Sequence, residues 1–271
     1  VLQAGPLVAF SSALRAEADA LKRFLYDNLY RHYQVMRMTA KARKVVREVY
    51  AQIDPRVSVS LLCQDGERMQ KGTTVLTLKG PAHSLLEGER VALNFCQRMS
   101  GVASITRAFV DALPAGSRTR IVDTRKTTPG LRALERHAVR AGGGHNHRED
   151  LGAAVLIKGN HIAAAGGVGQ AIDRARERSP HTSRIECEVD TLAQLEIALA
   201  HRADVVLLDN FDDADLERAV SMIAGRALID VSGGVSLARI PQIARHGVDV
   251  ISVGALTHSA RAIDLGLDWS A

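Results

Sequence analysis

The chain has few cysteines and few aromatic residues. Its 271 residues include three cysteines, one tryptophan and 4% aromatic residues in all. Cys63, Cys96 and Cys187 are odd in number, widely spaced and form no CxxC pair, so the sequence predicts neither a disulfide framework nor a zinc site. This cysteine usage is typical of a reducing compartment.

Long apolar runs and a secretory signal are also lacking. No stretch approaches the roughly 20 apolar residues that span a bilayer, and the first ten residues lack a basic start and a cleavage pattern. We therefore expect a cytoplasmic protein with no membrane partner. Its 46% hydrophobic and 24% charged residues suit a globular chain with a full core.

Positive charges exceed negative charges by five at neutral pH. That balance is compatible with nucleic acid, a membrane surface or acidic metabolites as partners. One hypothesis is nucleic-acid binding through the basic stretch from residue 37 to 47, beside two tyrosines. Because a basic helix is more often a solvated face, we expect no nucleic-acid partner.

The chain changes character near residue 57. Residues 12–50 carry apolar residues at helical spacing with no glycine or proline, which predicts one or two helices. Residues 57–63 and 73–80 are rich in β-branched and apolar residues and are bounded by glycine turns, which predicts antiparallel strands. A helix is expected from about residue 84 to 99.

From Arg118 onward, short apolar β-runs alternate with helical stretches. Such alternation predicts parallel strands joined by crossover helices. Without a G-x-G-x-x-G after the first strand, it favours an α/β barrel over a dinucleotide-binding sheet. We expect a small α/β domain over residues 1–101 and a barrel over residues 102–271. The expected barrel strands are residues 120–123, 154–158, 185–189, 205–209, 227–231 and 248–254.

Charged or glycine-rich residues follow nearly every expected strand, which is where α/β barrels place their active sites. Arginine forks and lysine point charges neutralise phosphates and carboxylates. The cluster therefore predicts a polyanionic small-molecule ligand. Its basic residues are Arg125, Lys126, His147, Arg148 and Lys158.

Lys158 ends the apolar run AVLIK. An ammonium group directed into a shared pocket requires an anion to offset its desolvation. A Schiff-base lysine is the alternative, because barrel aldolases also present a lysine at a strand end. The neighbouring cations Arg125, Lys126 and Arg148 favour anion binding.

Glu188 and Asp209 lie at neighbouring strand ends, with Asp230 as a weaker candidate for the same acidic rim. Two carboxylates there can hold Mg²⁺ through water or accept hydrogen bonds from ribose hydroxyls. The competing interpretation is that either carboxylate is structural charge paired with Lys158 or Arg125.

The turns Ser232-Gly233-Gly234 and Gly254-Ala255 follow the last two strands. Backbone amides at such turns, each at the start of a helix, form a phosphate site in barrels. Ordinary β-to-α turns also need glycine, but two successive turns of this kind favour phosphate.

A histidine metal site is an alternative, since His145, His147 and His161 lie in or near a glycine-rich loop. No matching carboxylate or cysteine spacing supports zinc. We interpret His147, next to Arg148, as a hydrogen-bond donor to a carboxylate, and we expect His137 on a helix surface.

The chain contains, in this order, the segments ERVALNFCQRMSG, DTRKTTPGLR, GGGHNHR, VLIKGNH, IECEVD, VLLDN, SGG and SVGALTHSA. With them, residues 52–271 resemble the quinolinate phosphoribosyltransferases, also called nicotinate-nucleotide pyrophosphorylases (carboxylating). The resemblance implies a small α/β domain and an incomplete α/β barrel, assembled as a homodimer or higher homo-oligomer. It also implies transfer of phosphoribose from phosphoribosyl pyrophosphate (PRPP) to quinolinate with Mg²⁺, giving nicotinate mononucleotide, pyrophosphate and CO₂ in NAD biosynthesis.

The resemblance also implies roles for single residues. Arg90 would reach into the partner subunit's site, although its helical spacing alone fits a solvated arginine paired with a neighbouring glutamate. The implied catalytic residues are Lys126, Lys158, Glu188 and Asp209, the last two also at the metal. The implied substrate-binding residues are Arg90, Arg125, Lys126, His147, Arg148, Lys158, Glu188, Asp209, Ser232, Gly233, Gly234, Gly254 and Ala255.

Some positions depart from the family pattern. Ala153, Gly159 and Asp230 stand where an acidic residue, an aspartate and a glutamate are usual. Residues 1–50 lack the usual N-terminal strands and instead resemble the C-terminal tail of deoxynucleotide triphosphohydrolase-like HD proteins, without a His-Asp metal motif. The alternative function is therefore a fusion or paralogue that keeps the anion-binding barrel but has impaired activity or an altered substrate.

Overall fold

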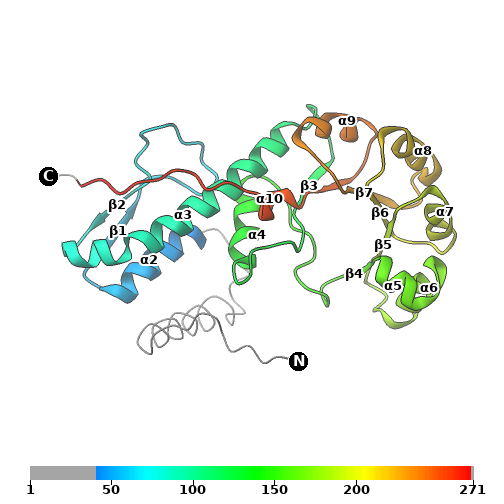
Figure 1. The fold of residues 1–271 in the computed structure, drawn as a ribbon, viewed down its shortest axis with the longest axis horizontal. Helices are drawn as coiled ribbons and strands as arrows, with labels where there is room; N and C mark the ends of the chain where they lie inside the picture. Colours follow the sequence, from blue (N-terminus) through cyan, green and yellow to red (C-terminus); the bar gives the residue numbers. More distant parts are fainter. Residues whose placement is uncertain (1–40, 270–271) are drawn as a thin grey trace, which may run out of the picture. The chain divides into compact units, whose positions relative to one another are not determined.

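A computed structural model describes residues 41–269 of the chain (Figure 1). The helices expected before residue 41 lie outside the described residues. No described helix combines the length and the apolar character that crossing a membrane requires.

A small layer of helices and strands precedes the barrel. Its core contains Val46 and Tyr50, which repeat four apart on one helix and are 2% and 1% exposed. The Tyr50 hydroxyl donates to the Leu85 carbonyl at 3.1 Å. A Cβ on Gly88 would lie 2.5 Å from the Tyr50 ring, so the two helices approach closely where glycine stands. The elements are α2 (Lys41–Ile53), β1 (Ser58–Leu61), β2 (Leu76–Lys79) and α3 (Ala82–Asp111), with β1 and β2 antiparallel.

The six expected barrel strands form one parallel sheet in the order β3-β8-β7-β6-β5-β4. Their buried, mostly β-branched and leucine side chains explain the apolar runs in the sequence. The strands are β3 (Arg120–Val122), β4 (Val155–Ile157), β5 (Ile185–Val189), β6 (Val205–Asp209), β7 (Leu228–Ser232) and β8 (Val250–Ser252).

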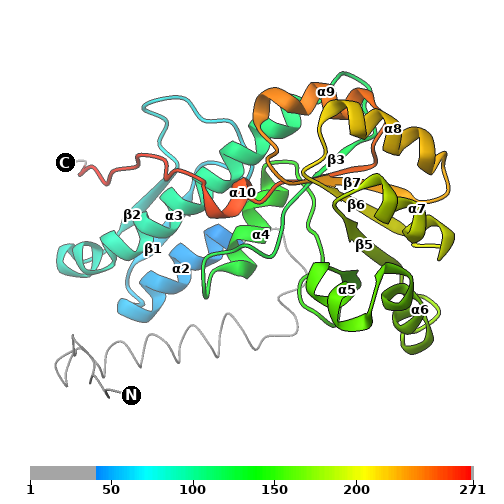
Figure 2. The same ribbon diagram turned by 45° about the vertical axis from the view of Figure 1, so that its right-hand side comes forward.

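Helices cover the outer side of the curved sheet, as Figures 1 and 2 show. Since β3 and β4 are both edge strands, the barrel is open between them. Among the described residues, one isolated bridge pairs Val122, the last residue of β3, with His145 in the loop after α4. The predicted incomplete α/β barrel with a smaller α/β layer is confirmed. The helices are α4 (Arg132–Ala141), α5 (Gly159–Ala165), α6 (Val168–Arg178), α7 (Leu192–Ala200), α8 (Asp213–Ile223), the 3₁₀ turn η3 (Leu237–Arg239), α9 (Ile240–Arg245) and α10 (Ala255–His258).

The long helix α3 is longer than the sequence predicts and contains residue 101, the predicted domain boundary. It contacts α2 in the small layer and α4, β3 and α10 in the barrel. The C-terminal segment crosses it: Ile263 N–H donates to the Gln97 carbonyl at 3.0 Å, and the Gln97 amide donates to the Leu265 carbonyl at 2.8 Å. Helix α3 therefore links the small layer to the barrel.

Candidate active site

The charged residues predicted at the strand ends lie at one edge of the sheet, because all six strands are parallel. Register places Glu188 of β5 opposite Leu207 of β6, and Asp209 of β6 opposite Ser232 of β7. Lys158 follows β4 directly and precedes α5. The carboxylates and the lysine are therefore brought together from three successive strands.

Lys158 pairs with Glu188 through its ammonium group. The Lys158 side chain is 47% exposed and the Glu188 side chain 17% exposed, so the pair is at the surface of the barrel mouth. Burial and the charge of Glu188 raise the pKa of Asp209, while Lys158 acts in the opposite direction. The two carboxylates thus repel each other within a field that the lysine partly neutralises.

Arg125, after β3, and Arg148, before β4, form a cationic cluster beside the open side of the barrel. Burial, followed by the positive charge of Arg125, lowers the pKa of Arg148. Within the described part of the chain, the Nε–H groups of both arginines are buried without a hydrogen-bond partner. Buried donors of this kind ordinarily meet an acceptor, so the pair suits an anion that supplies the missing oxygens.

The loop after β3 carries Lys126 towards the last helix. Thr257 Oγ1 donates to the Lys126 carbonyl at 2.8 Å. A Cβ built on Gly254 would lie 3.4 Å from Cδ of Lys126 and 2.9 Å from the His258 ring. The lysine stem therefore passes directly over the predicted phosphate turn at Gly254-Ala255.

The other predicted phosphate turn is tightly packed. Gly233 and Gly234 have φ angles of 80° and 56°, which favour glycine. A Cβ on Gly233 would lie 2.6 Å from the backbone nitrogen of Asn210. Asn210 itself donates to Asp209 at 2.8 Å. This turn thus packs against the end of β6, next to the carboxylates of Glu188 and Asp209.

His147 faces the barrel interior rather than the rim. Its Nε2 lies 3.2 Å from Glu186, and its Nδ1 accepts the Arg148 N–H at 2.7 Å. Nδ1 therefore lacks the proton of the neutral ring, and Nε2 carries it and donates to Glu186. Burial disfavours the imidazolium, but Glu186 and Asp230 together raise the pKa of His147.

Asp230 is wrongly predicted at the acidic rim. It is 2% exposed inside the barrel, accepts a hydrogen bond from Ser252 at 2.7 Å and leaves its other oxygen without a partner among the described residues. Burial, with the charge of Glu186, raises the pKa of Asp230 to about 7. Ligand atoms of His147, Glu186 and Asp230 lie within 4.8 Å of one another, but a metal on Nε2 would displace the proton that faces Glu186.

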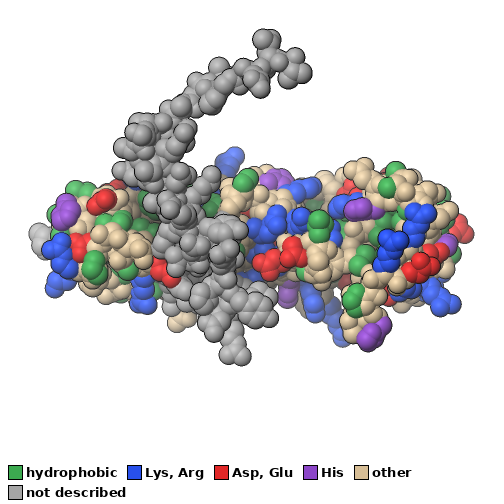
Figure 3. Space-filling view, turned by 90° about the horizontal axis from the view of Figure 1, so that it is seen from below, with side chains coloured by type: hydrophobic (Ala, Val, Ile, Leu, Met, Phe, Trp, Pro, Cys, Tyr) green, Lys and Arg blue, Asp and Glu red, His purple; other side chains and the backbone are tan. Residues whose placement is uncertain are grey.

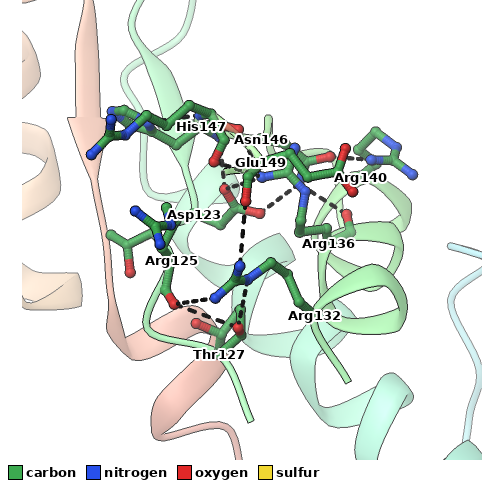
Figure 4. Close-up of polar contacts among 12 residues, drawn as sticks. Asp123, Arg125, Thr127, Arg132, Arg136, Arg140, Asn146, His147 and Glu149 are labelled. Carbon is green, nitrogen blue, oxygen red and sulfur yellow. Dashed lines mark hydrogen bonds and ion pairs between the residues drawn. The ribbon is translucent and has the colours of Figure 1, made fainter. Parts of the chain in front are cut away.

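Figure 4 shows how α4 holds the two cation-bearing loops. Three arginines four residues apart project from one face of α4. Arg132 donates to Thr127 Oγ1 at 3.0 Å, Arg136 to the His147 carbonyl at 2.7 Å, and Arg140 to Asn146. The four-residue spacing in the sequence could have revealed this face, which we did not predict.

Two other sequence expectations concern helical residues. Arg90 on α3 is solvated and lies 3.4 Å from Glu89, as its spacing alone suggests. His137 is wrongly predicted on a helix surface: it is 7% exposed and lies 3.1 Å from Asp65 in the small layer. The small layer covers the face of α4 that carries His137, so this polar face of the helix is buried.

The described surface gives no further support to nucleic-acid binding. Arg47 is exposed on α2, but the other basic side chains of that hypothesis lie outside the described ones. On the face drawn in Figure 3, basic side chains stand beside acidic and uncharged ones.

Comparison with known families gives two matches. The profile of the quinolinate phosphoribosyl transferase C-terminal domain matches residues 102–268, and that of the N-terminal domain matches residues 31–100. The likeness thus begins earlier than the expected residue 52 and includes part of the stretch that we interpreted as atypical.

Curated relatives extend the likeness over most of the chain. A nicotinate-nucleotide pyrophosphorylase (carboxylating) of Mycobacterium leprae is 48% identical over 76% of this chain and 72% of its own length. The human protein of the same name is 40% identical over 81% of this chain and 74% of its own length.

Solved structures agree with the fold. The nicotinate-nucleotide pyrophosphorylase of Ehrlichia chaffeensis is 35% identical and superimposes with a TM-score of 0.81, covering 96% of this chain and 99% of that chain. NadC of Streptococcus pyogenes is 37% identical with a TM-score of 0.78, covering 95% and 96% respectively. The chain therefore belongs to the quinolinate phosphoribosyl transferase family.

Proposed function

We propose that the protein transfers phosphoribose from PRPP to quinolinate with loss of CO₂, forming nicotinate mononucleotide and pyrophosphate for NAD synthesis. The observation that carries this proposal is the pair of buried, unpartnered guanidinium Nε–H groups of Arg125 and Arg148, within the described residues. Family membership supports the reaction. The alternative of a chain impaired in activity or altered in substrate has no specific observation in its favour.

Quinolinate would bind at the cluster beside the open side of the barrel. Arg125, Arg148 and Lys158 would neutralise its two carboxylates, and His147 would lie beneath them. The charge of Arg125 adds to burial in lowering the pKa of Arg148, and the two arginines become favourable neighbours once a dianion lies between them. Nicotinate, with one carboxylate, would leave part of this positive charge uncompensated.

PRPP would bind across the remaining strand ends. Lys126 and the backbone amides of residues 232–234 and 254–255 would hold phosphate groups, with support from the turn geometry at Gly233. Glu188 and Asp209 would hold Mg²⁺ together with the ribose hydroxyls. Two neighbouring carboxylates, one with a raised pKa, offer the hard oxygen donors that fit this ion.

The charge layout matches the proposed chemistry. As pyrophosphate leaves, the anomeric carbon gains positive charge, which Glu188 and Asp209 stabilise from their strand ends. Lys126 and Lys158 stabilise the negative charge on the departing group. When bound, Mg²⁺ neutralises pyrophosphate oxygens. Loss of CO₂ then leaves an electron pair on the ring carbon beside the cationic nitrogen, and that carbon takes up a proton from water to give nicotinate mononucleotide. No protein nucleophile is needed.

The assembly is proposed to be a homodimer or a higher homo-oligomer in which Arg90 enters the partner's site. Its solvated position on α3 supports this, since the side chain is free to extend. The proposal predicts complementation: random 1:1 mixing of subunits carrying Arg90→Ala with subunits carrying Lys158→Ala restores about a quarter of wild-type activity in a dimer. No recovery would remove Arg90 from the neighbouring site.

A cytoplasmic location is also proposed. Its support is the small number and wide spacing of the cysteines in the sequence, three in 271 residues, which suits a reducing compartment.

The substrate assignment is tested by pyrophosphate release with quinolinate, nicotinate and nicotinamide side by side. We expect release with quinolinate alone, because the second ring carboxylate completes the charge balance at Arg125 and Arg148. Equal turnover of nicotinate would contradict the assignment. Chelation of divalent ions is expected to stop release, and Mg²⁺ to restore it.

A further inference from the structure

Two loops that carry the proposed quinolinate cations meet at one buried carboxylate. Asp123 follows β3 directly, stands two residues before Arg125, and is fully buried. Its Oδ1 accepts the His147 N–H at 2.7 Å, and its Oδ2 accepts the Asn146 side-chain amide at 2.6 Å. Asp123 thus fixes the start of one cation-bearing loop to the backbone of the other (Figure 4).

Arg136 of α4 supports the same junction. Its guanidinium donates to the His147 carbonyl at 2.7 Å and lies 3.7 Å from Asp123 Oδ1. The side chain is 12% exposed. Burial raises the pKa of Asp123, while the His147 N–H and Arg136 favour its ionised form. One guanidinium therefore both neutralises the buried carboxylate and holds the carbonyl next to Arg148.

The junction lies where the sheet itself offers little support. In the described part of the chain, the only β-bridge from the edge strand β3 to residues 145–148 joins Val122 to His145. Arg125 and Arg148 repel each other, so an unsupported loop would separate them. Beyond residue 145, the side-chain contacts of Asp123 and Arg136 hold the second loop to the first.

We infer that Asp123 and Arg136 are positioning residues that hold Arg148 next to Arg125 and thereby determine the affinity for quinolinate. The inference rests on the proposed function, which assigns quinolinate to these cations. The contacts of Arg136 described above are to Asp123 and to the loop at residues 145–148. The groups proposed for PRPP lie on Lys126 and at the ends of β5 to β8, so the two substrates should respond differently.

The test compares steady-state constants and direct binding in Arg136→Gln, Arg136→Lys and Arg107→Gln. In Arg136→Gln, the quinolinate KM and Kd rise at least about tenfold, the effect of losing one charged hydrogen bond, and the PRPP KM stays within about twofold. Arg136→Lys keeps a charge and a donor and should stay within about threefold of wild type for quinolinate. Arg107→Gln makes the same change at an exposed pair on α3 and should alter neither constant.

Asn146→Ala provides a second variant, which keeps Arg136 and the net charge of the protein unchanged. It removes the contact to Asp123 Oδ2 and should raise the quinolinate KM by about threefold or more while leaving the PRPP KM unchanged. If Arg136→Gln does not fold, the quinolinate KM of Asn146→Ala tests the positioning role. A general loss of folded protein would lower kcat and leave both KM values alone.

These outcomes distinguish the positioning role of Asp123 and Arg136 from the proposed reaction with quinolinate. Wild-type protein that binds quinolinate, with Arg136→Gln or Asn146→Ala binding it equally well, overturns the positioning role alone. A parallel rise in both KM values also overturns it. Wild-type protein that binds no quinolinate overturns the proposed function, and the positioning role with it.

Discussion

The guanidinium of Arg98 lies 2.7 Å from the carboxylate of Glu135, joining α3 to α4 in the interior. Glu135 is fully buried and also accepts hydrogen bonds from the Thr128 hydroxyl and N–H, at 2.7 and 3.0 Å. The same guanidinium donates to the carbonyls of Thr257 and Ala260. One ion pair thus ties the long helix, the loop after β3 and the last helix to each other.

Removal of this arginine is expected to destabilise the fold. Arg98→Gln leaves the buried Glu135 carboxylate without its counter-charge, which costs about 3–5 kcal/mol. The free energy of unfolding from urea denaturation measures the loss. Arg107→Gln is the matched control on the same helix, and since its pair with Asp111 is more than half exposed, it should cost at most about 1 kcal/mol. Equal effects in the two variants would contradict the structural role of Arg98.

A glycine comparison tests the turn at Gly233. Gly225 and Gly233 have similar φ angles, 76° and 80°, but a Cβ on Gly225 meets nothing within 4 Å, whereas one on Gly233 meets the Asn210 backbone. Gly225→Ala should cost about 1 kcal/mol for backbone strain alone. Gly233→Ala should cost at least about 1 kcal/mol more and raise the PRPP KM. An unchanged PRPP KM in folded Gly233→Ala would remove this turn from phosphate binding.

Lys158 distinguishes anion binding from imine chemistry. Lys158→Ala should lower kcat by at least about a hundredfold because a charge that stabilises pyrophosphate is lost, with thermal unfolding nearly unchanged at this half-exposed side chain. Borohydride added during turnover should trap no substrate on the wild-type protein. A wild-type rate in Lys158→Ala removes the lysine from the site, and a trapped adduct favours the Schiff-base alternative.

The buried Asp230 should make stability depend on pH. Its pKa of about 7 in the fold exceeds the value of about 3.9 in the unfolded chain. A carboxyl group whose pKa rises on folding stabilises the protein fully below about pH 4 and loses that contribution as the pH rises to about 7. Asp230→Asn removes this dependence, so its melting temperature relative to wild type should increase between about pH 5 and about pH 8. A constant difference would show that Asp230 is ionised in the fold throughout.

The sequence predicts the barrel strands well because parallel, buried strands consist of short apolar runs. The expected positions 185–189 and 205–209 coincide with β5 and β6. The end of α3 is less predictable. The helix continues through Gly101 to Asp111, although glycine ordinarily weakens a helix. Glycine stands at residue 101 because a Cβ there would lie 2.0 Å from the Arg261 carbonyl oxygen.

The strand-end residues were predictable for a similar reason, since a residue that follows a parallel strand is carried to one edge of the sheet. The contacts that hold those residues in place were not predictable. Glu186 and Asp230 are acidic residues within strands, and alternation alone does not reveal that they face a closed interior. Arg98, Asp123 and Arg136 act through partners 37, 24 and 11 residues away, and a single sequence does not specify such pairs.

The central claim is that the cations at the mouth of the barrel bind a pyridine dicarboxylate and couple its decarboxylation to phosphoribosyl transfer. The most direct measurement is the stoichiometry of products from quinolinate labelled in the carboxylate next to the ring nitrogen, with PRPP and Mg²⁺. We predict CO₂, pyrophosphate and nicotinate mononucleotide in equal amounts. Pyrophosphate release without labelled CO₂, or at the same rate without quinolinate, would contradict the account.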